Sequence, residues 1–140
     1  MAPRTKAQKV IDTMYGNDAY SQWMGMERLE DGPGYCKLRM RVRVEMTNGF
    51  DIAHGGITYA LADSALAFAS NGHGRKSVSV ETNISHTRPV QTGDLLTATA
   101  VEKSLTNKIG IYEVTVKNQE DELVALFKGT VYRSDKEWEI

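Results

Sequence analysis

From Cys36 to Val44, every even position is apolar and every odd position is lysine or arginine. Alternation with a period of two predicts a β-strand with one buried and one solvated face. The turn-forming residues 31–34 precede this strand, and a second strand-like run covers 24–30. The two runs therefore predict a β-hairpin whose basic side chains face solvent.

The remaining pattern predicts a helix near residues 7–15, interrupted at Gly16-Asn17, and a group of strands in the second half of the chain. Four strand-like runs cover residues 76–87, 95–105, 109–118 and 122–132. Because short turns separate the last three, we expect them to form an antiparallel meander.

Between the hairpin and these strands lies the segment Gly55–Asn71, which reads GGITYALADSALAFASN. It is apolar nearly all round and stops at Asn71-Gly72, so it predicts a long helix covered by other elements. The order of helix, two strands, long helix and four strands predicts an α+β fold, with an antiparallel sheet curled around a central helix.

The length of 140 residues suits a single domain, 1–140, with an N-terminal helical segment over 1–20. The 17 basic residues nearly balance the 18 acidic ones, so we expect no nucleic-acid partner. The N-terminus carries no apolar run, which favours the cytoplasm over a membrane. Cys36 is the single cysteine and is expected to pack in the core, and the three histidines show no metal-ligand spacing.

Asp63 is the one ionisable side chain of the predicted central helix. Burying an unpaired carboxylate is costly, so the group must be paired, hydrated or used chemically. At the start of the same helix, Gly55 and Gly56 offer backbone N–H groups of the unsatisfied first turn. This combination indicates a site that binds an electron-rich oxygen beside an acid, base or nucleophile.

Several short motifs stand in a characteristic order: Asn48, His54-Gly55-Gly56, Leu61-Ala62-Asp63, the strand 78–84, Arg88-Pro89 and Gly93-Asp94. In this order they resemble the hotdog-fold acyl-CoA thioesterases of the phenylacetic-acid-degradation type. The resemblance covers about residues 21–133. It implies hydrolysis of an acyl-CoA, with aromatic acyl groups suggested by the subfamily, and no cofactor.

The resemblance also implies roles for single residues. Asp63 would be the catalytic carboxylate, Gly55 would donate its N–H to the thioester carbonyl, and Asn48 would position substrate or water. Ser79 would help to orient the water, with His54, Gly56 and Arg88 also contacting substrate. It further implies a homodimer or homotetramer in which one subunit supplies Asp63 and the other supplies Asn48 and Gly55.

Each of these residues also has a purely structural interpretation. His54 is a natural helix N-cap, Asn48-Gly49 a common turn, Ser79 an ordinary strand residue and Arg88 a surface charge. His86 and Tyr59 are expected to pack in the core rather than to line an acyl pocket. Two other functions remain open at this point: a hydratase or dehydratase of the same fold, and a non-catalytic acyl-CoA-binding module.

Overall fold

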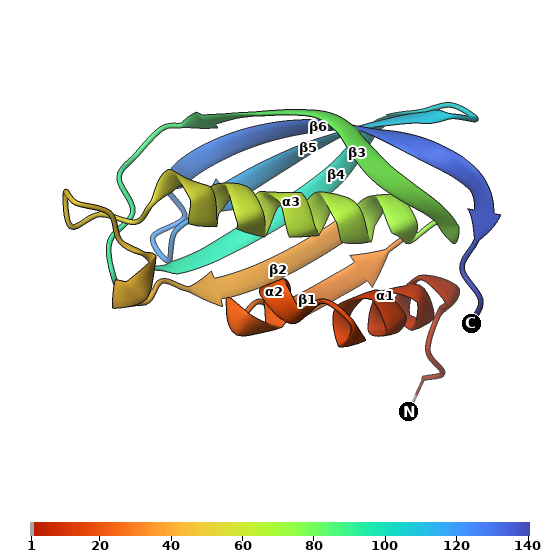
Figure 1. Cartoon of the computed structure of the whole chain (residues 1–140), viewed down its shortest axis with the longest axis horizontal. Helices are drawn as coiled ribbons and strands as arrows, with labels where there is room; N and C mark the ends of the chain where they lie inside the picture. Colours follow the sequence, from red (N-terminus) through yellow and green to blue (C-terminus); the bar gives the residue numbers. More distant parts are fainter. Residues whose placement is uncertain (1) are drawn as a thin grey trace.

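In the computed structural model, which describes residues 2–140, helix α3 (Gly55–Asn71) lies across one face of a six-stranded antiparallel sheet (Figure 1). The strand order is β1-β2-β4-β5-β6-β3. The strands are β1 Glu27–Gly32, β2 Tyr35–Arg41, β3 Arg75–His86, β4 Leu95–Leu105, β5 Ile109–Lys117 and β6 Leu123–Glu137. The predicted hairpin, meander and central helix are confirmed, and the fold is the α+β hotdog arrangement.

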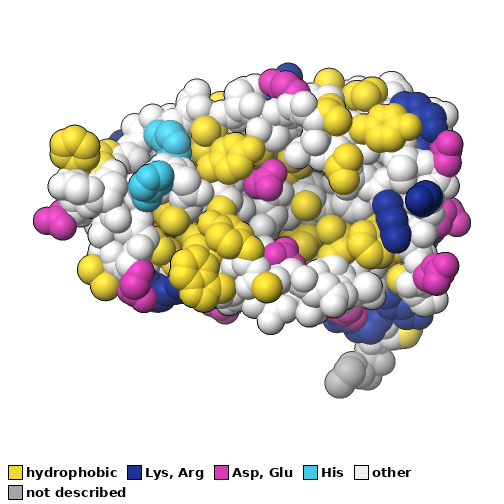
Figure 2. All heavy atoms as spheres, in the orientation of Figure 1, with side chains coloured by type: hydrophobic (Ala, Val, Ile, Leu, Met, Phe, Trp, Pro, Cys, Tyr) yellow, Lys and Arg dark blue, Asp and Glu magenta, His cyan; other side chains and the backbone are white. Residues whose placement is uncertain are grey.

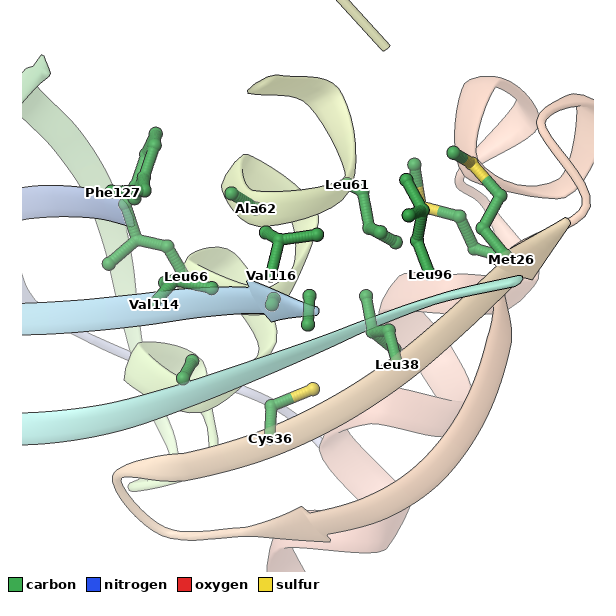
Figure 3. Close-up of a cluster of buried hydrophobic side chains, with 14 of the residues drawn as sticks. Met26, Cys36, Leu38, Leu61, Ala62, Leu66, Leu96, Val114, Val116 and Phe127 are labelled. Carbon is green, nitrogen blue, oxygen red and sulfur yellow. The ribbon is translucent and has the colours of Figure 1, made fainter. Parts of the chain in front are cut away.

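The core lies between α3 and the concave face of the sheet (Figure 3). Leu61 and Leu66 of α3 are buried against inward-facing side chains of the strands, including Leu38 and Val114. Cys36 belongs to the same cluster, and burial raises the pKa of its thiol. The prediction that this cysteine packs in the core is confirmed.

The N-terminal segment forms two helices, α1 (Lys6–Gly16) and α2 (Ala19–Trp23). Helix α1 begins with a capping box, in which the Thr5 hydroxyl accepts from the Gln8 amide at 3.1 Å and Gln8 Oε1 accepts from the Thr5 amide at 2.9 Å. Helix α2 was not predicted, and it moves the start of the first strand from residue 24 to Glu27. Met1, the first residue of the predicted helical segment, lies outside the described residues.

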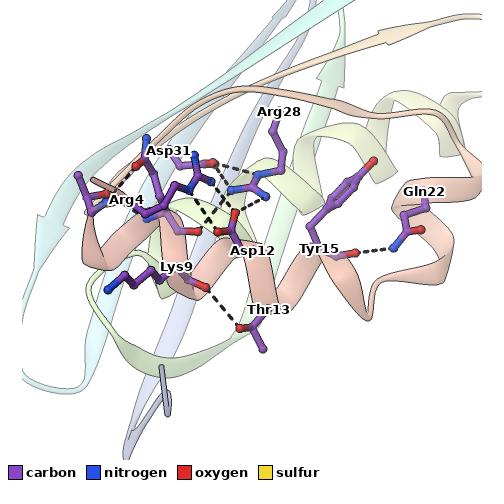
Figure 4. A network of polar contacts seen from close by, with 10 residues as sticks. Arg4, Lys9, Asp12, Thr13, Tyr15, Gln22, Arg28 and Asp31 are labelled. Carbon is purple, nitrogen blue, oxygen red and sulfur yellow. Dashed lines mark hydrogen bonds and ion pairs between the residues drawn. The ribbon is translucent and has the colours of Figure 1, made fainter. Parts of the chain in front are cut away.

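Arg28 of β1 fastens α1 to the edge of the sheet (Figure 4). Its guanidinium lies 2.9 Å from Asp12 Oδ1 on α1 and 2.6 Å from Asp31 Oδ2 on its own strand. The guanidinium of Arg28 also lies over the ring of Tyr15 on α1, with its central carbon 5.9 Å from the ring centroid. Helix α1 is thus fixed against β1.

Strand β3 forms an open edge of the sheet, because it pairs with β6 on one side only. Val78 and Val80 on this strand are 65% and 61% exposed. Such an edge offers unpaired backbone groups and apolar side chains to another strand. Among the described residues, no helix is long and apolar enough to span a membrane.

Candidate functional site

Helix α3 begins with one backbone donor left free. His54 is the N-cap, and its Nδ1 atom accepts a hydrogen bond from the Gly56 N–H at 2.9 Å. The Gly55 N–H donates to no other group within residues 2–140. The expectation of two free N–H groups therefore holds for Gly55 alone, and the N-cap interpretation of His54 is confirmed.

The Gly55 amide lies beside a cavity of about 410 Å³, called here the Gly55 cavity. Its lining comes from the loop before α3, the first turn of α3 and the loop after β3. The polar and charged lining residues are Asn48, Thr58, His86, Thr87 and Arg88. The cavity is therefore lined both by a residue with a free backbone donor and by several side chains that can bind an oxygen-rich ligand.

Two predicted residues of this cavity also make structural contacts. Asn48 Oδ1 accepts from the Phe50 amide at 2.9 Å, which closes the turn that was the alternative interpretation. Its Nδ2 atom donates no hydrogen bond within the described chain. Arg88 is exposed at the rim and pairs with Glu122 at 3.3 Å. Both side chains thus keep donors that a ligand can use.

Asp63 lies in a second cavity of about 310 Å³, called here the Asp63 cavity. Its other lining residues are Met14 of α1, residues 66, 67, 70 and 71 of α3, residues 77–79 of β3, and Val131. No residue within 2–140 forms a salt bridge with Asp63. Burial, and after it the charge of Asp18, raises the pKa of Asp63. Ser79 lines the same cavity as Asp63.

The two cavities divide the predicted site residues into two groups. Asn48, Gly55 and Arg88 line one cavity, whereas Asp63 and Ser79 line the other. Gly55 and Asp63 are eight positions apart on the helix, a rise of about 12 Å. One carbonyl group cannot contact the Gly55 amide and the Asp63 carboxylate of the same chain.

Two further residues line the Gly55 cavity: Thr58, which no sequence pattern singled out, and His86, for which core packing was expected. His86 is exposed and lines the Gly55 cavity, so the expectation of core packing is wrong for it. A Cβ atom placed on Gly55 would lie 3.2 Å from His86 Nε2. Thr58 is 2% exposed and lines the same cavity three residues after Gly55, a spacing that puts both on one helix face.

Tyr59 packs in the core as expected, with its ring 5.5 Å from that of Phe127 and its hydroxyl 2.7 Å from Thr82 Oγ1. His73 bonds to Glu102 at 2.7 Å, away from both cavities. Within residues 2–140, no three His, Cys, Asp or Glu side chains are grouped to hold a metal ion.

The face of the molecule that shows α3 carries many hydrophobic side chains, with acidic groups among them (Figure 2). Along α3, Ala60, Asp63, Ser64 and Ala67 are only partly buried. These residues recur at spacings of three and four, so they form one stripe along the helix. Their side chains are small, so another surface can approach α3 closely along this stripe.

Comparison with known proteins gives consistent results. An Archaeoglobus fulgidus protein, whose name marks it as a provisional esterase, is 40% identical over 131 residues, covering 94% of this chain and 85% of that protein. The Escherichia coli acyl-coenzyme A thioesterase PaaI is 36% identical over 128 residues, covering 91% of each chain. The solved structure of E. coli PaaI superimposes with a TM-score of 0.92 at 35% identity, covering 94% of this chain and 96% of that one. Residues 50–125 match the family model of the thioesterase superfamily, and the chain belongs to that family.

Proposed function

We propose that this protein hydrolyses acyl-CoA thioesters to a free acid and CoA, at a site that two copies of the chain complete together. The observation that carries the proposal is the separation of a free Gly55 amide and a half-buried Asp63 along one apolar helix. The E. coli relative acts on acyl-coenzyme A by name, which supports the same substrate class here.

The Gly55 amide would bind the thioester carbonyl oxygen. Its N–H is the free donor at the positive end of the α3 dipole, where a developing oxyanion is stabilised. The absence of a side chain at position 55 leaves room for this approach, since even a Cβ atom would crowd His86. Asn48 and Thr58 line the same cavity and would supply further polar groups around this oxygen.

Asp63 would deliver the attack on the carbonyl carbon. Its raised pKa makes it a stronger base than an ordinary carboxylate. Two routes are open to it: activation of a water as general base, or direct attack to form a mixed anhydride. Ser79 shares the cavity and would orient the water or the carboxylate. The CoA thiolate is a good leaving group, so the reaction requires neither a strong general acid nor a cofactor.

The separation of about 12 Å along α3 and the open surfaces beside the helix support a site shared by two copies. A two-fold axis that passes beside α3, perpendicular to it and level with the midpoint between Gly55 and Asp63, makes the helices of the two copies antiparallel. It then sets Gly55 of one copy opposite Asp63 of the partner subunit. The stripe of partly buried small residues permits the helices to approach, and the exposed edge of β3 permits strand pairing between the copies.

The roles of the surrounding residues complete the proposal. Arg88 would bind a phosphate of CoA at the rim of the Gly55 cavity. His54 and Gly56 would shape the approach to the carbonyl, with the His54 Nδ1 atom committed to the Gly56 amide. An aromatic acyl group is proposed from the likeness to PaaI. The cytoplasmic location stays a prediction from the N-terminal sequence.

A panel of aryl, short, medium and long acyl-CoAs tests this function. We expect release of free thiol, detected with a thiol reagent, and no loss of enoyl-CoA absorbance with hydratase substrates. Asp63→Asn should lower kcat by at least about 10²–10⁴-fold while ligand binding persists. Binding without turnover by the parent protein would instead identify a binding module, and a kcat within threefold of the parent would remove Asp63 from the mechanism.

A further inference from the structure

A hydrogen-bonded chain runs from α2 to the residue next to Asp63. Asp18 caps α2 by accepting from the Ser21 amide at 3.0 Å, and its other carboxylate oxygen is 2.7 Å from the Ser21 hydroxyl. The Ser21 hydroxyl lies 2.8 Å from the hydroxyl of Ser64 on α3. Ser21 is 1% exposed, whereas Asp18 and Ser64 are partly exposed, so the central hydroxyl is the buried link between the two helices.

The chemistry of the three side chains decides which of them donates each hydrogen bond. An ionised carboxylate only accepts hydrogen bonds, so the Ser21 hydroxyl donates its single proton to Asp18. Ser21 then has lone pairs alone to offer Ser64, and Ser64 must be the donor between them. Both hydroxyl donors therefore point toward Asp18.

Asp18 is the charged group that acts on Asp63, and its hydrogen-bonded chain ends at Ser64, the residue that follows Asp63. Among residues 2–140, neither carboxylate forms a salt bridge with a cationic side chain. The elements that line the Asp63 cavity contribute no other charge, since α1 presents Met14 and β3 presents residues 77–79. A negative charge near Asp63 disfavours ionisation of that carboxyl and so makes it a stronger base.

We propose that Asp18 is a positioning residue for the reaction: its hydrogen bond to Ser21, which in turn contacts Ser64, fixes its carboxylate near Asp63. This inference rests on the proposed function and deepens it. The charge of Asp18 contributes, after burial, to the raised pKa of Asp63. A carboxylate of higher basicity is a more effective general base or nucleophile, provided that it remains ionised at the working pH.

Asp18→Asn tests the charge while keeping the structure, because asparagine is also a favourable N-cap and retains an oxygen that accepts from the Ser21 amide. The pH profile of kcat/KM should show its acid limb at lower pH in this variant than in the parent. The ratio of variant to parent activity should therefore rise as the pH falls. Asp135→Asn is the matched control, because it removes an equal charge from an exposed position on β6.

An acid limb that stays at the parent's position in Asp18→Asn would overturn the proposal. A second measurement separates this failure from failure of the proposed function. The titration of the Asp63 carboxyl carbon, followed by ¹³C NMR, needs no substrate and should have a lower midpoint in Asp18→Asn than in the parent and the control. If the parent hydrolyses no thioester, the proposed function is wrong, and the NMR midpoints alone confirm or refute the influence of Asp18.

Discussion

The side chain of Leu66 on α3 fills the space above Gly129 on β6. A Cβ atom at position 129 would lie 2.5 Å from Leu66 Cδ2, a distance that no real contact tolerates. This close approach sets the distance between the sheet and the helix that carries Asp63. Gly129→Ala should therefore destabilise the fold by about 1–3 kcal/mol through overpacking.

Urea unfolding of Gly129→Ala measures this effect, with Gly16→Ala as the control because nothing lies within 4 Å of a Cβ atom there. Combining Gly129→Ala with Leu66→Ala should recover part of the loss relative to the sum of the single changes. Strictly additive effects would show that the two residues do not constrain each other.

Asp63→Asn should make the folded protein more stable at neutral pH. Because the pKa of Asp63 is raised in the fold, the folded chain holds this proton more tightly than the unfolded chain does. Stability from that proton is fully present below the ordinary value of 3.8 and is lost as the pH rises through the raised folded pKa. Thermal unfolding should give Asp63→Asn a higher Tm than the parent at pH 7, with the difference vanishing in acid. A lower Tm for the variant at pH 7 would contradict the assigned shift.

A larger side chain at position 55 should reduce kcat more than it raises KM. A side chain there pushes on His86 and displaces the carbonyl oxygen from the Gly55 amide. Since that hydrogen bond strengthens as charge develops, its loss appears in the transition state, where one oxyanion donor is worth about 10²–10³ in kcat. Steady-state kinetics of Gly55→Val and Gly16→Ala test this point. A Gly55→Val enzyme with full kcat would indicate that the glycine serves packing alone.

A charge on the open edge of the sheet should separate the two copies. Val80 lies exposed on β3, beside the irregular pairing between residues 79 and 81. Val80→Asp should place a charge where the partner's strand is expected and should give a single-chain mass in light scattering, with loss of thioesterase activity. Val101→Asp on β4, which is inside the sheet order, is the control. A Val80→Asp variant that stays dimeric and active would remove β3 from the interface.

Much of the fold could be predicted because its signals are local. The alternation of apolar and basic residues identified β2, and the apolar segment with its glycines identified α3 at its observed bounds. Helix α2 escaped detection because five residues are too few to show a helical period, although Asp18 is a typical N-cap. Strand β6 runs five residues beyond Tyr132 because its pairing with β3 continues to Glu137, a contact between distant segments.

The candidate site could likewise be predicted only where its signals are local in the sequence. Asp63 and Gly55 could be singled out, because an ionisable group and a side-chain-free helix start are visible in a single apolar segment. The position of His86 beside Gly55 could not, since it depends on how the end of β3 packs against the start of α3. The separation into two cavities likewise depends on α1 and β3, which are distant from α3 in sequence.

Mixed dimers of Asp63→Asn and Gly55→Val chains test the shared site most directly. Each variant alone has both sites damaged, but a mixed dimer with a two-fold shared site has one site with both changes and one site with neither. Doubly tagged mixed dimers should therefore show about half the parent's activity per dimer, far above either variant alone. If Gly55 and Asp63 of the same chain formed each site, every site would carry one damaging change. Mixed dimers no more active than the two separate variants would contradict the account.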